Sequence, residues 1–165
     1  MIKQLLLPVV LLAVTGSAFA QTATAPAAPA AQTAPAAQLT AAQKAQLEKQ
    51  NAQMATASLQ IAQMVDQNQA GQVWDNASII AKQTNARAEF VQMVGADRAK
   101  LGAVKTRQLA SIGRVQSTGG KLPPGLYINV NYATQFANAS KPVRELISFH
   151  LDKDNVWRIS GYTVR

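Results

Sequence analysis

The most informative reactive side chain in the sequence is the carboxylate of Glu145. Alternation along the predicted strand puts it on the same face as Ile147 and Phe149, where a bare carboxylate would be costly to bury. Glu145 therefore needs a cationic partner. Arg107 and Arg98 are the natural candidates, because a guanidinium can bind a carboxylate through two parallel hydrogen bonds.

Two interpretations of Glu145 follow. In the first, it is a pocket carboxylate that binds a ligand or transfers a proton, and it is then the one weak candidate for a catalytic residue. Arg107, Arg98, Tyr132 and Trp74 would bind the ligand with it, and Tyr162 could also line the cavity. In the second, Glu145 and an arginine form a structural ion pair near the strand's edge, and the aromatic residues are simply core.

Other reactive groups are scarce. The chain has no cysteine, which excludes disulfides, thiolate metal sites and thiol nucleophiles, and its single histidine excludes an imidazole cluster. With only eight acidic residues, a carboxylate metal site is not expected. No motif for a cofactor or for a Ser-His-Asp triad surrounds His150, which alternation places on the polar face of its strand, exposed beside Arg144 and Ser148.

The formal net charge is +8, and loss of Lys3 with a cleaved leader would lower it by one. Between Arg98 and Arg144 the sequence contains no acidic residue but eight basic ones. Folded together, these would form a positive surface able to attract anionic components of a cell envelope. A solvated basic face without a dedicated partner is the plainer alternative. Nucleic acid is not expected as a partner, because no base-stacking motif is present.

The first 20 residues are typical of a signal peptide: a basic start at Lys3, an apolar stretch from Leu5 to Val14 and small residues before a cleavage site. We expect cleavage between Ala20 and Gln21. The apolar stretch is shorter than the roughly 18 residues that a membrane span requires, so no transmembrane segment is expected after cleavage. The protein is predicted to be periplasmic or secreted. Residues 21–38, rich in Ala, Pro, Thr and Gln, are predicted to be a disordered linker.

A single domain is predicted for residues 39–165, beginning with about three helices. Thr40 and Gln43 form a capping box at the start of a long helix that continues to Val65. Its first turns, rich in Gln and Ala, are expected to project, and its later turns to pack on a sheet. A polar turn from Asp66 to Gly71 separates it from a short second helix over residues 73–81.

The third helix is predicted to follow a cap at Thr84 or Asn85 and to end at Gly102. Its buried stripe would include Phe90 and Met93. Four antiparallel strands follow, over residues 104–115, 126–136, 143–151 and 156–162, and the last three alternate clearly. In the first strand the phase is ambiguous, with Val104, Thr106, Ala110 and Ile112 placed on one face. The predicted fold class is α+β, with the helices on one face of a curved four-stranded sheet.

The closing Trp157-Arg158-x-Ser160-Gly161-Tyr162 block, together with several shorter blocks before it, resembles one family of exported bacterial proteins, the domain of unknown function 4019. The similarity covers about residues 62–165, and the closing block is its most specific part. The other matching residues are Trp74-Asp75, Arg98-x-x-Leu101-Gly102, Arg107, Pro124-Gly125-x-Tyr127, Phe136 and Glu145. Phe90 stands where the family tends to carry Trp, and Asp154-Asn155 replaces an acidic-Gly turn.

The resemblance implies export and an architecture, since the family has no established activity. The order of helices and strands is also similar to the cone of nuclear-transport-factor-two-like and cystatin-like proteins, a fold that hosts both enzymes and binding domains. We therefore expect a non-catalytic binding module for an unknown small ligand or envelope component. A small ketosteroid-isomerase-like enzyme using Glu145, and a basic-surface protein bound to anionic envelope polymers, are the alternatives. The sequence leaves the oligomeric state open.

Overall fold

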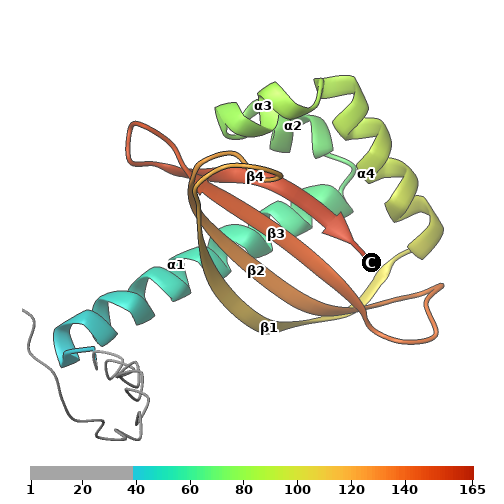
Figure 1. The fold of residues 1–165 in the computed structure, drawn as a ribbon. Helices are drawn as coiled ribbons and strands as arrows, with labels where there is room; N and C mark the ends of the chain where they lie inside the picture. Colours follow the sequence, from blue (N-terminus) through green and yellow to red (C-terminus); the bar gives the residue numbers. More distant parts are fainter. Residues whose placement is uncertain (1–38) are drawn as a thin grey trace, which may run out of the picture. The chain divides into compact units, whose positions relative to one another are not determined.

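A computed structural model of the chain describes residues 39–165. The signal peptide predicted for residues 1–20 and the linker predicted for residues 21–38 lie outside the described residues. The described part contains four helices followed by four strands, which confirms the predicted α+β class (Figure 1). None of its helices is both long and apolar enough to cross a bilayer.

Helix α1 (Ala41–Asp66) begins with the predicted capping box, in which the Thr40 hydroxyl accepts from the Gln43 backbone and the Gln43 side chain accepts from the Thr40 backbone. Its first turns are exposed and its buried residues fall in the second half, as predicted. These residues are spaced three or four apart and form one face of the helix: Met54, Ser58, Ala62 and Val65. Figure 1 shows this half crossing one face of the sheet while the first turns extend past it.

The predicted second helix is divided into α2 (Ala70–Asp75) and α3 (Ile79–Thr84). Ser78 causes the break, because its hydroxyl accepts the backbone N–H of Ile80 and so caps a new helix. The Ser78 backbone N–H donates to the Ile159 carbonyl at 2.8 Å, which ties the break to the sheet. The break is therefore held by α3 on one side and by the sheet on the other.

Helix α4 (Arg87–Leu101) begins three residues after Thr84, and the Glu89 carboxylate, rather than a Thr84 or Asn85 side chain, caps the backbone N–H of Ala86. It ends at Gly102, as predicted, with the left-handed φ of 72° that favours glycine. Phe90 is buried, but Met93 is 46% exposed, so the prediction that Met93 belongs to the buried stripe was wrong. The buried face of α4 is therefore narrower than the spacing of its apolar residues predicted.

The sheet is antiparallel and open, with strand order β1-β2-β3-β4. Its strands are β1 (Val104–Ser117), β2 (Gly125–Phe136), β3 (Val143–Leu151) and β4 (Trp157–Val164). The predicted buried alternation of β2 and β3 is confirmed, since Ile128, Val130 and Ile147 are fully buried. These residues form one core with the inward residues of the helices. The cone of nuclear-transport-factor-two-like and cystatin-like proteins stays a prediction.

The predicted phase of β1 was wrong in part. Its pairing with β2 shifts between Val104 and Thr106 and again between Leu109 and Ser111, so one extra residue is inserted at each place. Each bulge reverses the alternation. As a result Arg107, paired with Thr134, and Arg114, whose guanidinium binds Gln50 of α1, both lie on the face that α1 covers.

Candidate functional site

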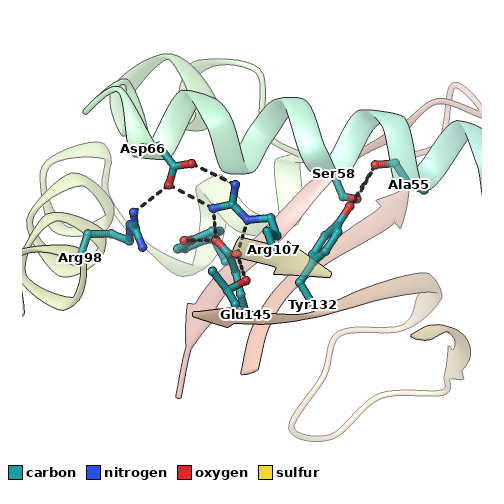
Figure 2. A network of polar contacts seen from close by, with 9 residues as sticks. Ala55, Ser58, Asp66, Arg98, Arg107, Tyr132 and Glu145 are labelled. Carbon is teal, nitrogen blue, oxygen red and sulfur yellow. Dashed lines mark hydrogen bonds and ion pairs between the residues drawn. The ribbon is translucent and has the colours of Figure 1, made fainter. Parts of the chain in front are cut away.

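Glu145 lies on β3 with its side chain turned toward α1 and fully buried, with 0% exposure. Its carboxylate accepts four hydrogen bonds, at 2.6 Å from Arg107 Nε, 3.1 Å from Arg107 Nη2, 2.7 Å from Thr134 Oγ1 and 2.6 Å from Tyr162 Oη (Figure 2). Burial alone would raise the pKa of Glu145, but these hydrogen bonds and the charge of Arg107 lower it below its usual value. The carboxylate is therefore ionised, enclosed and fully bonded.

Arg107 connects Glu145 to the helices. Its Nη1 and Nη2 donate to the two carboxylate oxygens of Asp66 at 3.0 and 3.1 Å, and Arg98 Nη2 donates to the same carboxylate at 2.7 Å (Figure 2). Burial alone would lower the pKa of Arg107, but the bonds to Asp66 and Glu145 raise it above its usual value. The four charged groups form one network with two cations and two anions, hereafter the Asp66–Glu145 network.

Tyr162 closes the network from β4. Burial and the negative charge of Glu145 both raise the pKa of Tyr162 well above its usual value. The phenol therefore keeps its proton and donates a hydrogen bond to Glu145. The Glu145 end of the network is chemically passive, because the donors around this carboxylate already bind it and no free lone pair is turned to solvent.

The structure brings together three of the five candidate site residues: Glu145, Arg107 and Arg98. Tyr132 stands opposite Glu145 in the β2–β3 pairing, but its hydroxyl binds α1, at 2.7 Å from Ser58 Oγ and 3.1 Å from the Ala55 carbonyl. Trp74 lies on α2, where its Nε1 donates to the carbonyl of Asn85, the residue after α3, at 3.2 Å. Tyr132 and Trp74 thus anchor helices rather than face the network.

Asp66 is the member of the network that the sequence did not reveal. It is the last residue of α1, where the negative end of the helix dipole disfavours an acidic side chain. That unfavourable position was the available signal, because an acidic residue there requires a cationic partner. The partners lie 32 and 41 residues further along the chain, and no local pattern identifies them.

His150 is 7% exposed, so the prediction that it lies exposed on the polar face was wrong. Its ring packs against Tyr127, with ring centroids 4.9 Å apart, and a Cβ at Gly125 would collide with its Nε2. The first residues of β2 therefore cover this part of the outer face. Alternation predicted the direction of His150 correctly but could not predict this cover.

Ser78, His150 and Asp152 meet in space although no sequence motif joins them. Ser78 Oγ donates to Asp152 Oδ1 at 2.5 Å, and His150 Nδ1 lies 2.8 Å from the same oxygen. In a nucleophilic triad the serine and the acid bind opposite nitrogens of the imidazole. Here Ser78 approaches Nδ1, at 3.4 Å, and Nε2 is buried beside Gly125. The three residues form a structural cluster that ties the helical break to the turn after β3.

A hollow of about 450 Å³ opens between the ends of α1 and α4, beside Asp66 and Arg98. Arg98 Nε and Nη1 are buried and have no hydrogen-bond partner within residues 39–165, and the guanidinium carbon lies 4.3 Å from the centre of the Phe136 ring. Gly95 leaves space, since a Cβ there would meet no atom within 4 Å. The residues that line the hollow, here called the α1–α4 hollow, are Val65, Asp66, Asn68, Gly95, Arg98, Ala99, Gly102, Ala103 and Val104.

Metal binding has no support among residues 39–165, in which no three His, Cys, Asp or Glu side chains are grouped closely enough to hold an ion.

The described part is an α+β domain whose helices cover one face of an open sheet, with the Asp66–Glu145 network at one end. A family model, the protein of unknown function DUF4019, matches residues 57–162, and the chain belongs to that family. No curated protein matches the chain.

Proposed function

We propose that the protein is an exported, non-catalytic binding module and that a small polar ligand occupies the α1–α4 hollow. The observation that carries this proposal is Arg98, whose Nε and Nη1 groups are buried at the hollow without a partner in residues 39–165. A buried donor without a partner costs roughly 1–3 kcal/mol, and more when it is charged. An acceptor oxygen carried by a ligand, directly or through a water, would remove that cost.

The lining of the hollow supports a ligand with both acceptors and donors. Arg98 supplies donors, while Asp66, whose side chain is 26% exposed, supplies a carboxylate already bonded to Arg98 and Arg107. The charges of the network balance, so neither a strong anion nor a strong cation is favoured. A neutral or zwitterionic polar molecule fits this balance better than a highly charged one.

Binding without catalysis fits the state of Glu145. A general base works best with a pKa near the operating pH and must reach the proton that it removes. Glu145 has 0% exposure and a lowered pKa, and its acceptor positions are taken by Arg107, Thr134 and Tyr162. A ketosteroid-isomerase-like mechanism would require a substrate to displace this cluster, which argues for the binding module.

The ligand proposal is tested by filling the hollow. Gly95→Leu puts a side chain into the open space beside Arg98, and Gly113→Leu is the matched control, because a Cβ at Gly113 also meets no atom within 4 Å but lies on β1. Thermal unfolding would be measured against a panel of amino acids, monosaccharides and short dicarboxylates. We expect at least one compound to stabilise the wild type and the Gly113→Leu variant but not Gly95→Leu. Stabilisation that survives Gly95→Leu, or none by any compound, would remove the proposal.

Export is tested separately. The full chain is expressed in a bacterium with an intact secretory pathway, and the periplasmic fraction is analysed by intact mass and N-terminal sequencing. The expected first residue is Gln21. Retention of Met1 on protein found only in the cytoplasm would contradict export and leave the ligand proposal standing.

A further inference from the structure

Two arginines lie directly opposite each other on the face of the sheet turned away from α1. Arg144 of β3 and Arg165, which follows β4, exchange both backbone hydrogen bonds at 2.9 Å. Residues paired in this way have their side chains next to each other on one face. Since Glu145 faces α1, alternation directs Arg144 and Arg165 to the opposite face, where both are exposed.

This pairing is unfavourable unless something compensates the charge, because like charges directly opposite each other destabilise a sheet. The acidic residues are used elsewhere: all of them except Glu48 and Glu89 form ion pairs with other basic groups. Within residues 39–165, neither Arg144 nor Arg165 forms an ion pair. Lys141, exposed in the turn before β3, adds a third positive charge without an ion pair in the same residues.

The Arg144 guanidinium is held in a defined position. Its Nε donates to Asn131 Oδ1 at 2.7 Å, and Asn131 Nδ2 donates to Ser111 Oγ at 3.1 Å. These bonds draw the guanidinium over β2 and leave its Nη1 and Nη2 without a hydrogen-bond partner in the described part of the chain. An arginine fixed through Nε with both terminal amino groups free is suited to bidentate binding of an oxyanion.

A shallow hollow adjoins this guanidinium. Its volume is about 470 Å³, and its lining is mainly apolar, with Ser111, Asn131 and Arg144 as the residues with polar side chains at the surface. Its lining residues include Ala110, Ser111, Asn131, Ala133, Pro142 and Arg144. The open shape suits a group that is presented on a longer molecule, since it gives access along the surface rather than enclosing a free small ligand.

We propose that Arg144, Arg165 and Lys141 form a binding site for the oxyanion groups, phosphate or carboxylate, of an anionic polymer. Arg144 binds one group through Nη1 and Nη2, and Arg165 and Lys141 contact its neighbours along the chain. The polymer would neutralise the positive charge that these three residues bring to this end of the sheet. This site is independent of the α1–α4 hollow, which lies on the helical side of the sheet.

Calorimetric titration of the mature protein with sodium polyphosphate and with polygalacturonate, in 50 and 200 mM NaCl, tests the proposal. We expect binding that weakens with salt, because exposed charge pairs are screened. Arg144→Gln combined with Arg165→Gln should reduce affinity about tenfold or more, as expected for lost charge-assisted hydrogen bonds. Lys44→Gln combined with Lys49→Gln removes the same net charge from exposed positions on α1 and should change affinity less than twofold.

Two further variants separate a built site from a merely basic surface. Asn131→Ala leaves the net charge unchanged but releases Arg144, and it should weaken binding severalfold. Arg144→Lys keeps the charge but loses the planar guanidinium that binds an oxyanion through two hydrogen bonds. This variant should also weaken binding severalfold. Binding of both polymers supports a general oxyanion site, and binding of one identifies its source as phosphate or carboxylate. Equal losses in the arginine and lysine double variants, no effect of Asn131→Ala, or no binding by the wild type in 50 mM NaCl would each overturn the proposal.

Discussion

Arg107 of β1 reaches across β2 to bind Glu145 of β3 through two hydrogen bonds, of 2.6 and 3.1 Å. Thr134, on the intervening strand, donates to the same carboxylate. The pair therefore joins three strands, and Asp66 extends it to α1 and, through Arg98, to α4. This one network fixes the end of the sheet against the helices, so disturbing it should affect the stability of the domain.

Glu145→Gln is expected to destabilise the domain by about 3 kcal/mol, because it removes one charge of a buried pair and leaves Arg107 with the partly exposed Asp66 as its remaining anionic partner. The amide of the glutamine can accept through one oxygen only, while Arg107, Thr134 and Tyr162 together offer more donors. Urea unfolding measures the change in the free energy of unfolding.

Asp154→Asn is the control for this experiment. It removes a carboxylate whose pair with Arg158 is on the surface, with the Asp154 side chain 54% exposed. Exposed pairs contribute little to stability, so this variant should unfold close to the wild type. A Glu145→Gln variant as stable as Asp154→Asn would mean that the network is not a structural element, and the case for a functional Glu145 would return.

Alternation in the last three strands was enough to predict that Glu145 faces the core and needs an arginine. The pattern is local, with a period of two residues, and a buried face enforces it. Arg107 could be named only as one of two candidates, because the bulges of β1 shift its phase and leave no signature in the sequence. The direction of a side chain can therefore be predicted from the sequence on a regular strand, but not on a strand with bulges.

Contacts between segments that are distant in the sequence could not be predicted from alternation. Asp66 was interpreted as a turn residue, although it binds Arg98 and Arg107. The predicted outward direction of His150 was correct, but the start of β2, which contains Gly125, covers the side chain. Both errors have one cause: periodicity specifies which face a residue occupies, whereas what packs on that face depends on tertiary structure.

Acid should unfold the domain through Glu145. Its pKa is lowered in the folded protein, so the unfolded chain binds the proton more tightly and stability falls as the pH falls through the folded pKa. The stability from this group is complete above the unfolded value of about 4.3 and is lost below it. Asp152 adds to the same trend, because bonds from Ser78, His150 and Arg158 outweigh the effect of burial and lower its pKa.

The free energy of unfolding measured in urea between pH 2.5 and pH 7 checks this expectation. The wild type should hold a plateau at neutral pH and lose stability below about pH 4.3, the usual pKa of an unfolded glutamate. Glu145→Gln should lose less over the same interval, since one of the responsible carboxylates is gone. Parallel curves for the two proteins would show that Glu145 does not contribute to acid unfolding.

Gly125→Ala is expected to destabilise the domain by about 3 kcal/mol, from two causes. The φ of Gly125 is 150°, a conformation that costs a residue with a Cβ on the order of 1–3 kcal/mol. In addition, the new methyl group would collide with His150 Nε2. The second cause can be isolated by adding His150→Ala, which removes the ring.

A double-mutant cycle in thermal unfolding makes this separation. If the collision contributes, Gly125→Ala should cost less in the His150→Ala background than in the wild type. Equal costs in the two backgrounds would assign the whole effect to the backbone conformation of Gly125.

Gly95→Ala is expected to stabilise the domain, in contrast to Gly125→Ala. Gly95 lies inside α4, where glycine is less favourable than alanine by roughly 0.5–1 kcal/mol, and a Cβ there meets no atom within 4 Å. Gly102→Ala is the matched control on the same helix: its φ of 72° and the Asn138 side chain, 3.0 to 3.2 Å from the position of the Cβ, should make alanine destabilising. Thermal unfolding should therefore move the two variants in opposite directions. A lower melting temperature for Gly95→Ala would show that α4 needs the flexibility of glycine beside the α1–α4 hollow.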